Sequence, residues 1–208
     1  DELGGADPYS ASKTISELIV KAHRESFFKN KKKCGISSAR TGNVIGGGDW
    51  SEKRLIPACI KSLIKNKVIL LRNPNSVRPW QFVLEPLKGY LILAKKQFEN
   101  PLKFSGSWNF GTEPSSVTNV KQIVKYMIEF WGQGKMKTLK NIKFYEQQNL
   151  QLDITKAKKK LGWFPTYNIK HSVRITTEWY FKIFKKRKNP LEVTNEQIES
   201  YMNKNNWT

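Results

Sequence analysis

The sequence predicts an α/β protein built on a parallel sheet. Residues 8–33 carry apolar side chains at three- and four-residue spacing, as an amphipathic helix does, and Gly35 is expected to end that helix. A short strand is expected at 36–40. A helix that leads through a short turn into a strand is half of a β-α-β crossover, which joins parallel strands. The glycine-rich segment 41–54 follows the carboxyl end of this strand. Loops at the carboxyl ends of parallel strands form the ligand crevice, so a substrate is expected to lie there.

The composition is that of a folded globular protein. The chain has 208 residues, of which 38% are hydrophobic and 12% aromatic, enough for one domain with a real core. No apolar run approaches the roughly 20 residues that span a bilayer, so we expect no membrane partner. The first residue is not Met and no basic-then-apolar leader opens the chain, so we expect a fragment without a signal peptide. Cys34 and Cys59 set no disulfide framework and favour a cytoplasmic location.

The net charge of +20 is the unusual feature of the composition. Such a charge first suggests a nucleic-acid partner. The lysines, however, are spread along the whole chain, and their densest clusters lie near the ends of predicted helices, where the helix dipole favours cations. We therefore expect no nucleic-acid partner, and we expect the positive field to attract an anionic substrate.

The remaining elements follow in order along the chain. Helices are expected where apolar residues recur at helical spacing, at 55–66, 86–98, 117–131 and 169–186. Extended segments are expected at 68–71, 77–83, 108–111 and 143–146, with a turn at 73–75. Residues 152–165 predict a short helix that Gly162 closes and Trp163 anchors. We expect 189–208 to be a polar, peripheral tail with one short helix after Thr194.

The first candidate site is the Tyr-x-x-x-Lys pair at the start of the first helix. Asp7 is a good N-cap, and Pro8 suits the first helical position because its missing N–H would have no partner there. Tyr9 and Lys13 then lie one turn apart on the same face. An ammonium group beside a phenol favours the phenolate, so Tyr9 is a candidate general acid/base. The alternative is a surface tyrosine beside a solvated lysine.

Four further segments follow this pair in a fixed order. They are Arg40-Thr41-Gly42-Asn43-Val44-Ile45-Gly46-Gly47-Gly48-Asp49-Trp50, Arg54-Leu55-Ile56-Pro57, Val77-Arg78-Pro79-Trp80-Gln81-Phe82-Val83-Leu84-Glu85-Pro86, and Leu152-Asp153-Ile154-Thr155-Lys156-Ala157 through Leu161-Gly162-Trp163-Phe164-Pro165. The series resembles the extended short-chain dehydrogenase/reductase family over residues 1 to about 185. Within that family it looks most like the branch of 4,6-dehydratases that act on CDP-glucose.

The resemblance implies a partial Rossmann-like parallel sheet with a smaller C-terminal substrate-binding α/β subdomain. Residues 1–50 would be the C-terminal remainder of the NAD-binding Rossmann domain. Residues 51–188 would be mostly the nucleotide-sugar-binding subdomain, with a return to the Rossmann part near 68–98, and 189–208 would be the polar tail.

The resemblance also implies the chemistry and the residues that carry it. Tyr9 would take the C4 hydroxyl proton of CDP-glucose while bound NAD takes the C4 hydride; water then leaves across C5 and C6, and the hydride returns to C6. Lys13 would assist Tyr9 and bond the nicotinamide ribose, and the cofactor set would be Tyr9, Lys13 and Arg40. In the substrate set, Asn43 would lie near the diphosphate or sugar, and Arg54 and Arg78 would hold the phosphates. Leu55, Ile56 and Pro57 would lie by the nucleobase. Trp80 and Glu85 complete the substrate set. A structural Arg78–Glu85 pair is the alternative for Arg78.

The chain departs from the family pattern at its start. The glycine-rich turn that seats the NAD pyrophosphate, the acidic residue for the adenosine ribose and the Thr-Asp-Lys segment for water loss do not occur in it. We expect all three to lie upstream of Asp1, so the chain by itself should neither hold NAD nor turn over substrate. The resemblance also implies that the longer protein is a homodimer through the 8–33 helix.

Two other functions stay open at this point. One is a sister activity on the same fold, a 4-epimerase or a decarboxylase. The other is a basic, non-enzymatic binding module. The isolated His23 and His171 predict no metal site, since they lack the Cys/His spacing of a zinc site.

Overall fold

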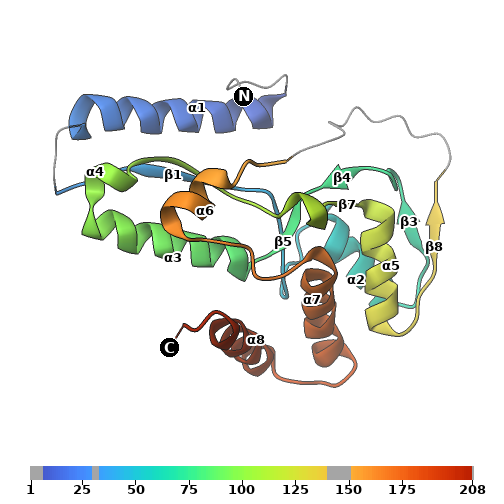
Figure 1. Ribbon diagram of the computed structural model, residues 1–208. Helices are drawn as coiled ribbons and strands as arrows, with labels where there is room; N and C mark the ends of the chain where they lie inside the picture. The colour runs from blue at the N-terminus through green and yellow to red at the C-terminus, as the bar shows by residue number, and fades with distance from the viewer. Residues whose placement is uncertain (1–6, 30–32, 140–150, 208) are drawn as a thin grey trace. The chain divides into compact units, whose positions relative to one another are not determined.

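The computed structural model describes residues 7–29, 33–139 and 151–207 (Figure 1). Two compact units interleave along the chain. The first unit takes Asp1–Arg40, Lys88–Phe110 and Ile154–Phe164, and the second takes Thr41–Leu87, Gly111–Asp153 and Pro165–Thr208. The domain boundaries expected near residues 50 and 188 stay predictions.

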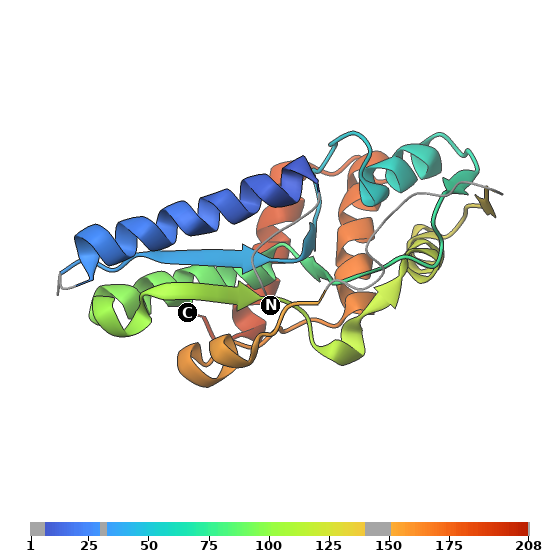
Figure 2. The ribbon, with the colours of Figure 1, turned by 90° about the horizontal axis from the view of Figure 1, so that it is seen from above.

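The first unit is a strand pair flanked by helices. Strand β1 (Ser37–Thr41) lies beside β6 (Gly106–Phe110), and the two run in the same direction (Figure 2). In Figure 1, helix α1 (Pro8–His23) and helix α3 (Leu84–Glu99) lie on opposite sides of this pair. The short helices are α4 (Pro101–Phe104) and α6 (Thr155–Leu161).

Helix α1 begins as the sequence predicts and ends earlier. The Asp7 side chain accepts hydrogen bonds from the backbone N–H groups of Tyr9 and Ser10, and Pro8 occupies the first turn. The helix continues as one π-helical stretch, η1 (Arg24–Phe28), and Lys29 is the last described residue before residue 33. Gly35 lies beyond this end. The backbone at Gly35 lies close to that of Pro101, because a Cβ at Gly35 would be 2.7 Å from the Pro101 carbonyl oxygen.

Tryptophan and phenylalanine side chains fill the core of the first unit. Gly162 closes α6 in the left-handed conformation (φ 65°), and the next residue, Trp163, is fully buried with its ring edge-on to Phe110 at 5.1 Å. This confirms the predicted closure and anchor. The buried cluster consists of Leu93, Phe104, Trp108, Phe110, Ile154, Ala157, Leu161 and Trp163.

Short strand pairs form the framework of the second unit. Strands β2 (Asn43–Ile45) and β5 (Trp80–Phe82) are parallel, with Asn43 opposite Trp80 and Ile45 opposite Phe82. Strands β3 (Ile69–Leu71) and β8 (Met136–Thr138) are also parallel. The pair β4 (Val77–Arg78) and β7 (Thr118–Asn119) is antiparallel. The parallel α/β character that the sequence predicts is confirmed.

Helices supply most of the core of the second unit. They are α2 (Leu55–Ile64), α5 (Val120–Trp131), α7 (Ile169–Phe184) and α8 (Pro190–Lys204), with the 3-10 turn η2 (Pro114–Ser116). Helix α5 packs on α7 (Figure 1). The largest buried cluster consists of Ile45, Ile56, Cys59, Ile60, Leu63, Ile69, Leu71, Trp80, Ile123, Val124, Met127, Trp131, Ile169, Val173, Trp179, Tyr180 and Val193.

Most expected elements are found within a few residues of their predicted bounds. The segment 41–54 differs, because Asn43–Ile45 inside it pairs with β5 as strand β2 instead of staying a loop. Strand β8 was not expected, since Met136–Thr138 has no long apolar run and is held by its pairing with β3. The strand expected at 143–146 lies outside the described residues.

Most side chains of the polar tail expected at 189–208 are exposed, but its helix begins before Thr194 and is longer than expected. Helix α8 begins at Pro190, where the Asn189 side chain accepts a hydrogen bond from the backbone N–H of Leu191. Val193 is 0% exposed and Tyr201 is 3% exposed. Two buried side chains in an otherwise polar helix are too few to reveal an apolar face from the sequence, but they fix the helix to the second unit.

No described helix is both long enough and apolar enough to cross a membrane.

Burial in α8 leads to a stability prediction. Val193→Ala should lower the free energy of unfolding by about 2 kcal/mol, because it removes methyl groups from a filled site. Leu191→Ala, two residues away at a side chain that is 68% exposed, is the control and should stay within about 0.5 kcal/mol of the parent. Urea unfolding measures both. Equal effects would contradict the packing of α8.

Candidate active site

The Tyr9–Lys13 pair lies on the first turns of α1 in the first unit. The Lys13 ammonium is 5.5 Å from the centroid of the Tyr9 ring, so the predicted shared face is confirmed. Tyr9 is 71% exposed. The hydrogen bonds from the Ser10 hydroxyl and backbone to Asp7 lower the pKa of that carboxyl, which keeps the helix cap charged. The pair is accessible at a well-capped helix start, as an acid/base residue requires.

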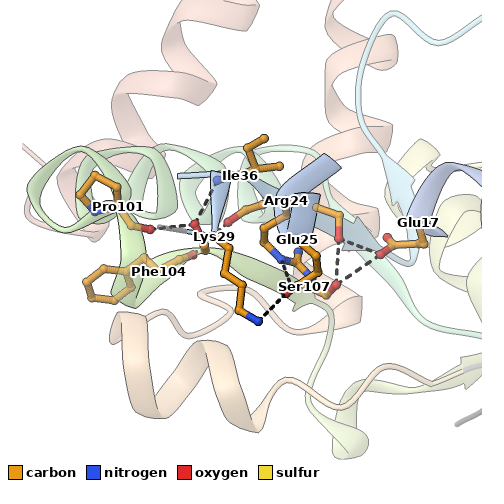
Figure 3. Close-up of polar contacts among 11 residues, drawn as sticks. Glu17, Arg24, Glu25, Lys29, Ile36, Pro101, Phe104 and Ser107 are labelled. Atoms are coloured by element: carbon orange, nitrogen blue, oxygen red, sulfur yellow. Dashed lines mark hydrogen bonds and ion pairs between the residues drawn. The ribbon is translucent and has the colours of Figure 1, made fainter. Parts of the chain in front are cut away.

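A carboxylate two turns further along α1 holds the helix to the strand pair (Figure 3). Glu17 Oε2 accepts hydrogen bonds from the Ser38 hydroxyl at 2.7 Å and the Ser107 hydroxyl at 3.3 Å, so it contacts both β1 and β6. Glu17 Oε1 lies 3.4 Å from Nε of Arg40. Glu17 was not among the predicted site residues, although its spacing of four from Lys13 places it on the face of the pair.

The predicted substrate residues of β2 and β5 are brought together by strand pairing. Asn43 begins β2 directly after β1 ends, and its Cα partner in the register is Trp80. Asn43 is exposed, whereas Trp80 is buried in the core cluster. Asn43 therefore offers its amide to solvent, and Trp80 supports the strand beneath it.

Arg54 is the accessible cation at the start of α2. It is the residue before the first helical turn, its side chain is 66% exposed, and its Nη1 lies 3.2 Å from Oδ2 of Asp49. Partial burial acts to raise the pKa of Asp49, but the hydrogen bonds from Ser51 and the Arg54 guanidinium outweigh it, so the net shift is downward. Of the three residues after Arg54, Leu55 is half-buried, and Ile56 and Pro57 are buried.

Arg78 lies in strand β4 and is half-buried. Its Nη1 donates a hydrogen bond to the carbonyl oxygen of Val77 at 2.9 Å. In the antiparallel pairing its Cα partner is Thr118 of β7. A predicted phosphate role for Arg78 stays a prediction.

Glu85, predicted to contact substrate, is 0% exposed and joins three segments of the second unit. Its Oε1 accepts from the backbone N–H of Tyr167 at 2.8 Å, and its Oε2 accepts from the backbone N–H of Thr166 at 2.9 Å. The Tyr201 hydroxyl donates to the same Oε2 at 2.8 Å. These contacts give Glu85 a structural role, and its substrate role stays a prediction.

The glycine loop after β2 rests on helix α7. A Cβ at Gly47 would lie 2.2 Å from the indole of Trp179, so only glycine fits there. The Tyr180 hydroxyl donates to the carbonyl oxygen of Asp49 at 2.7 Å. Burial, and then the Asp49 charge, raise the pKa of Tyr180 to about 12, so it remains a donor at neutral pH. The sequence predicts a helix here but gives no sign of this contact.

The predicted residues are therefore divided between the units. Tyr9, Lys13 and Arg40 belong to the first unit, and Asn43, Arg54, Leu55, Ile56, Pro57, Arg78, Trp80 and Glu85 belong to the second.

Within the described ranges, no group of three or more His, Cys, Asp or Glu side chains is arranged to hold a metal ion. Cys34 and Cys59 are free thiols, and burial raises the pKa of Cys59 to about 12.

Comparison with known families assigns the chain to one of them. The sequence model of the family described as GDP-mannose 4,6 dehydratase matches residues 2–176. The chain belongs to this family. The sequence resemblance to nucleotide-sugar members of the extended short-chain dehydrogenase/reductases is thereby confirmed.

The curated relatives that the chain matches are longer than this chain. The chain is 38% identical over 207 residues to a CDP-glucose 4,6-dehydratase of Salmonella typhimurium, covering 97% of this chain and 57% of the relative. It is 25% identical over 181 residues to a dTDP-glucose 4,6-dehydratase of Xanthomonas campestris pv. campestris, covering 83% and 49%. The chain thus spans about half the length of these relatives.

Solved structures share the fold. A dTDP-glucose 4,6-dehydratase from Bacillus anthracis, in complex with NAD, superposes with a TM-score of 0.71 at 19% identity, covering 87% of this chain and 54% of that one. A UDP-glucuronic acid 4-epimerase from Bacillus cereus, in complex with UDP-glucuronic acid and NAD, gives 0.70 at 17% identity, covering 85% and 53%. At these identities the likeness establishes the fold alone.

The contacts of Glu85 lead to a prediction about its role. Glu85→Gln should lower the free energy of unfolding by about 1–3 kcal/mol, since the new amide N–H₂ would face a backbone N–H or the Tyr201 hydroxyl in a buried site. Glu99→Gln, at an exposed position on the same helix, should stay within about 0.5 kcal/mol. Urea unfolding at pH 7 without nucleotide compares the two. Equal stability of parent and Glu85→Gln would exclude the structural role.

Proposed function

We propose that the protein containing this chain converts CDP-glucose to CDP-4-keto-6-deoxyglucose by NAD-dependent dehydration. The observation that carries the proposal is the 38% identity to a CDP-glucose 4,6-dehydratase over 97% of this chain. The free cysteines suit a reducing compartment, and we place the reaction in the cytoplasm.

The Tyr9–Lys13 pair supports the redox part of the proposal. NAD, when bound, supplies the acceptor for the C4 hydride and returns that hydride at C6. Tyr9 takes the proton from the C4 hydroxyl, and its 71% exposure leaves the phenol open to a sugar. Lys13, on the same face, holds the phenol in place and offers donors to the nicotinamide ribose. Arg40 completes the cofactor set from its position beside Glu17.

The second unit supplies the substrate-binding residues in this proposal. The guanidinium groups of Arg54 and Arg78 suit the diphosphate, because their planar donors pair with phosphate oxygens. Asn43, exposed at the start of β2, offers an amide to the diphosphate or the sugar. Half-buried Leu55 lies by the nucleobase, with Ile56, Pro57, Trp80 and Glu85 fixing the surrounding backbone. The net charge of +20 favours the approach of an anionic nucleotide sugar.

A 4-epimerase is the second candidate, because the accessible Tyr9–Lys13 pair would serve that activity equally well. An epimerase also begins by oxidising C4, so Tyr9 and Lys13 would keep their roles. The two activities differ in the product, since an epimerase returns the hydride to C4 and loses no water.

A turnover assay tests the proposal and the role of Tyr9. The protein expressed from its complete reading frame, supplied with NAD+, should convert CDP-glucose faster than UDP-glucose or dTDP-glucose to a 4-keto-6-deoxy product. Tyr9→Phe removes the ionisable hydroxyl and should lower kcat at least about 100-fold. Tyr126→Phe, on α5, is the matched control and should leave kcat within twofold, about the scatter of such assays.

Three results would contradict this assignment. A C4 epimer without water loss would indicate the epimerase. Preference for another nucleotide would overturn the CDP-glucose substrate. Salt-sensitive nucleic-acid binding in place of turnover would indicate the basic binding module.

We also propose that the complete protein is a homodimer through α1. No residue of this helix is buried, and Ile15, Leu18 and Ile19 form an apolar stripe in which each side chain is about half exposed. Glu17 directs the polar contacts of the helix toward β1 and β6, which leaves the stripe facing outward. The same stripe on a second copy would cover it, as two amphipathic helices cover each other.

Charge placed on the stripe should therefore separate the dimer. Leu18→Glu should shift the molar mass measured by light scattering from dimer to monomer, because a carboxylate would be buried without a partner. Leu191→Glu, at an exposed residue of α8, is the control and should leave the mass unchanged. A Leu18→Glu protein that stays dimeric would place the interface elsewhere.

A further inference from the structure

The loop from Gly46 to Arg54 is held to helix α7 through its backbone. The indole of Trp179 lies where a side chain of Gly47 would be, so the loop backbone lies directly on the helix. Trp179 is itself fixed, because its indole N–H donates to the Thr194 hydroxyl of α8 at 2.9 Å. Trp50 adds edge-on ring contacts to Tyr180 at 5.3 Å and Phe184 at 5.5 Å. The loop is therefore supported in the middle of its glycine run, at Gly47, and just after the run, at Trp50.

Tyr180 makes the polar part of this attachment. Its side chain is fully buried, and its hydroxyl donates to the carbonyl oxygen of Asp49 at 2.7 Å, with the Gly46 carbonyl oxygen at 3.4 Å. Carbonyl groups of a glycine-rich loop are otherwise free to rotate, since glycine restricts the backbone least. A single buried hydroxyl thus fixes the direction of the peptide at Asp49.

The side chain of Asp49 in turn orients the exposed guanidinium of Arg54. Its Oδ1 accepts from the backbone N–H of Ser51 at 2.9 Å, and its Oδ2 contacts Nη1 of Arg54 at 3.2 Å. An exposed arginine samples many rotamers, and ordering it on ligand binding costs free energy. A guanidinium has five N–H donors, so the contact with Asp49 leaves others for a ligand.

We infer that Tyr180 is a positioning residue for anion binding by Arg54. It acts through Asp49, whose backbone it holds and whose carboxylate orients the guanidinium. The ligand class is a nucleoside diphosphate, and this assignment rests on the proposed function. Tyr180 and Asp49 lower the cost of binding by presenting Arg54 already ordered, and neither touches the reacting carbons.

The inference predicts a change in affinity without a change in chemistry. In the complete protein with NAD+, Tyr180→Phe should raise KM for CDP-glucose, and Kd for CDP by calorimetry, about fivefold, the factor that one hydrogen bond contributes. The value of kcat should stay within twofold of the parent. Tyr126→Phe, whose ring stacks on Phe130 in α5, is the control and should change neither constant.

A double-mutant cycle tests whether the effect passes through Arg54. In an Arg54→Lys background, the Tyr180→Phe substitution should change Kd for CDP by less than twofold, because the group that it positions has been removed. Additive effects of the two substitutions would overturn the inference. An unchanged Kd in Tyr180→Phe, or a fall in kcat with unchanged KM, would overturn it as well.

Hydrogen exchange separates this inference from the proposed function. Backbone amides of residues 46–54 should exchange at least about fivefold faster in Tyr180→Phe than in Tyr126→Phe, with or without nucleotide. If the parent protein turns over no CDP-glucose, the proposed function fails, while faster exchange together with weaker CDP binding still supports the role of Tyr180. Equal exchange rates in the two variants would overturn that role even in an active dehydratase.

Discussion

The second unit depends on one buried carboxylate. Glu85 accepts two backbone N–H groups, from Thr166 and Tyr167, and the hydroxyl of Tyr201. It thereby ties the start of α3 to the segment before α7 and to α8. A buried charge is costly unless donors surround it, and here the three donors come from two separate parts of the chain, Thr166–Tyr167 and helix α8. Glu85 follows strand β5 by three residues, and Tyr167 precedes helix α7 by two, so this carboxylate joins the segments next to those two elements.

The first unit uses polar contacts where an apolar core would be usual. Glu17 and the hydroxyls of Ser38 and Ser107 hold α1 against β1 and β6, while the aromatic cluster around Trp108 and Trp163 lies among α3, α6 and β6. The arrangement leaves the apolar side chains of α1 pointing outward and Tyr9 accessible at its start. A helix that is attached by its polar face is free to offer its other face to a second copy.

Helix caps and glycine closures were predictable because their signals are local. Asp7-Pro8 and Gly162 act on their own backbone neighbours, so the start of α1 and the end of α6 could be predicted from the residues alone. Strands β2 and β8 and helix α8 were mispredicted or missed because their stability comes from partners distant in sequence. The roles of Glu17, Glu85 and Tyr180 were likewise hidden, since a single polar residue carries no periodic signal.

The sequence by itself determined the α/β class, the family, the paired Tyr9 and Lys13, and the glycine loop, because these depend on residue types at short spacing. Only the tertiary structure decided that Glu85 is enclosed by backbone donors, that Trp179 lies against Gly47, and that the Asp49 peptide is held by Tyr180. Such contacts join residues about 80 to 130 positions apart. Their existence depends on how separate elements pack, and no local pattern records that packing.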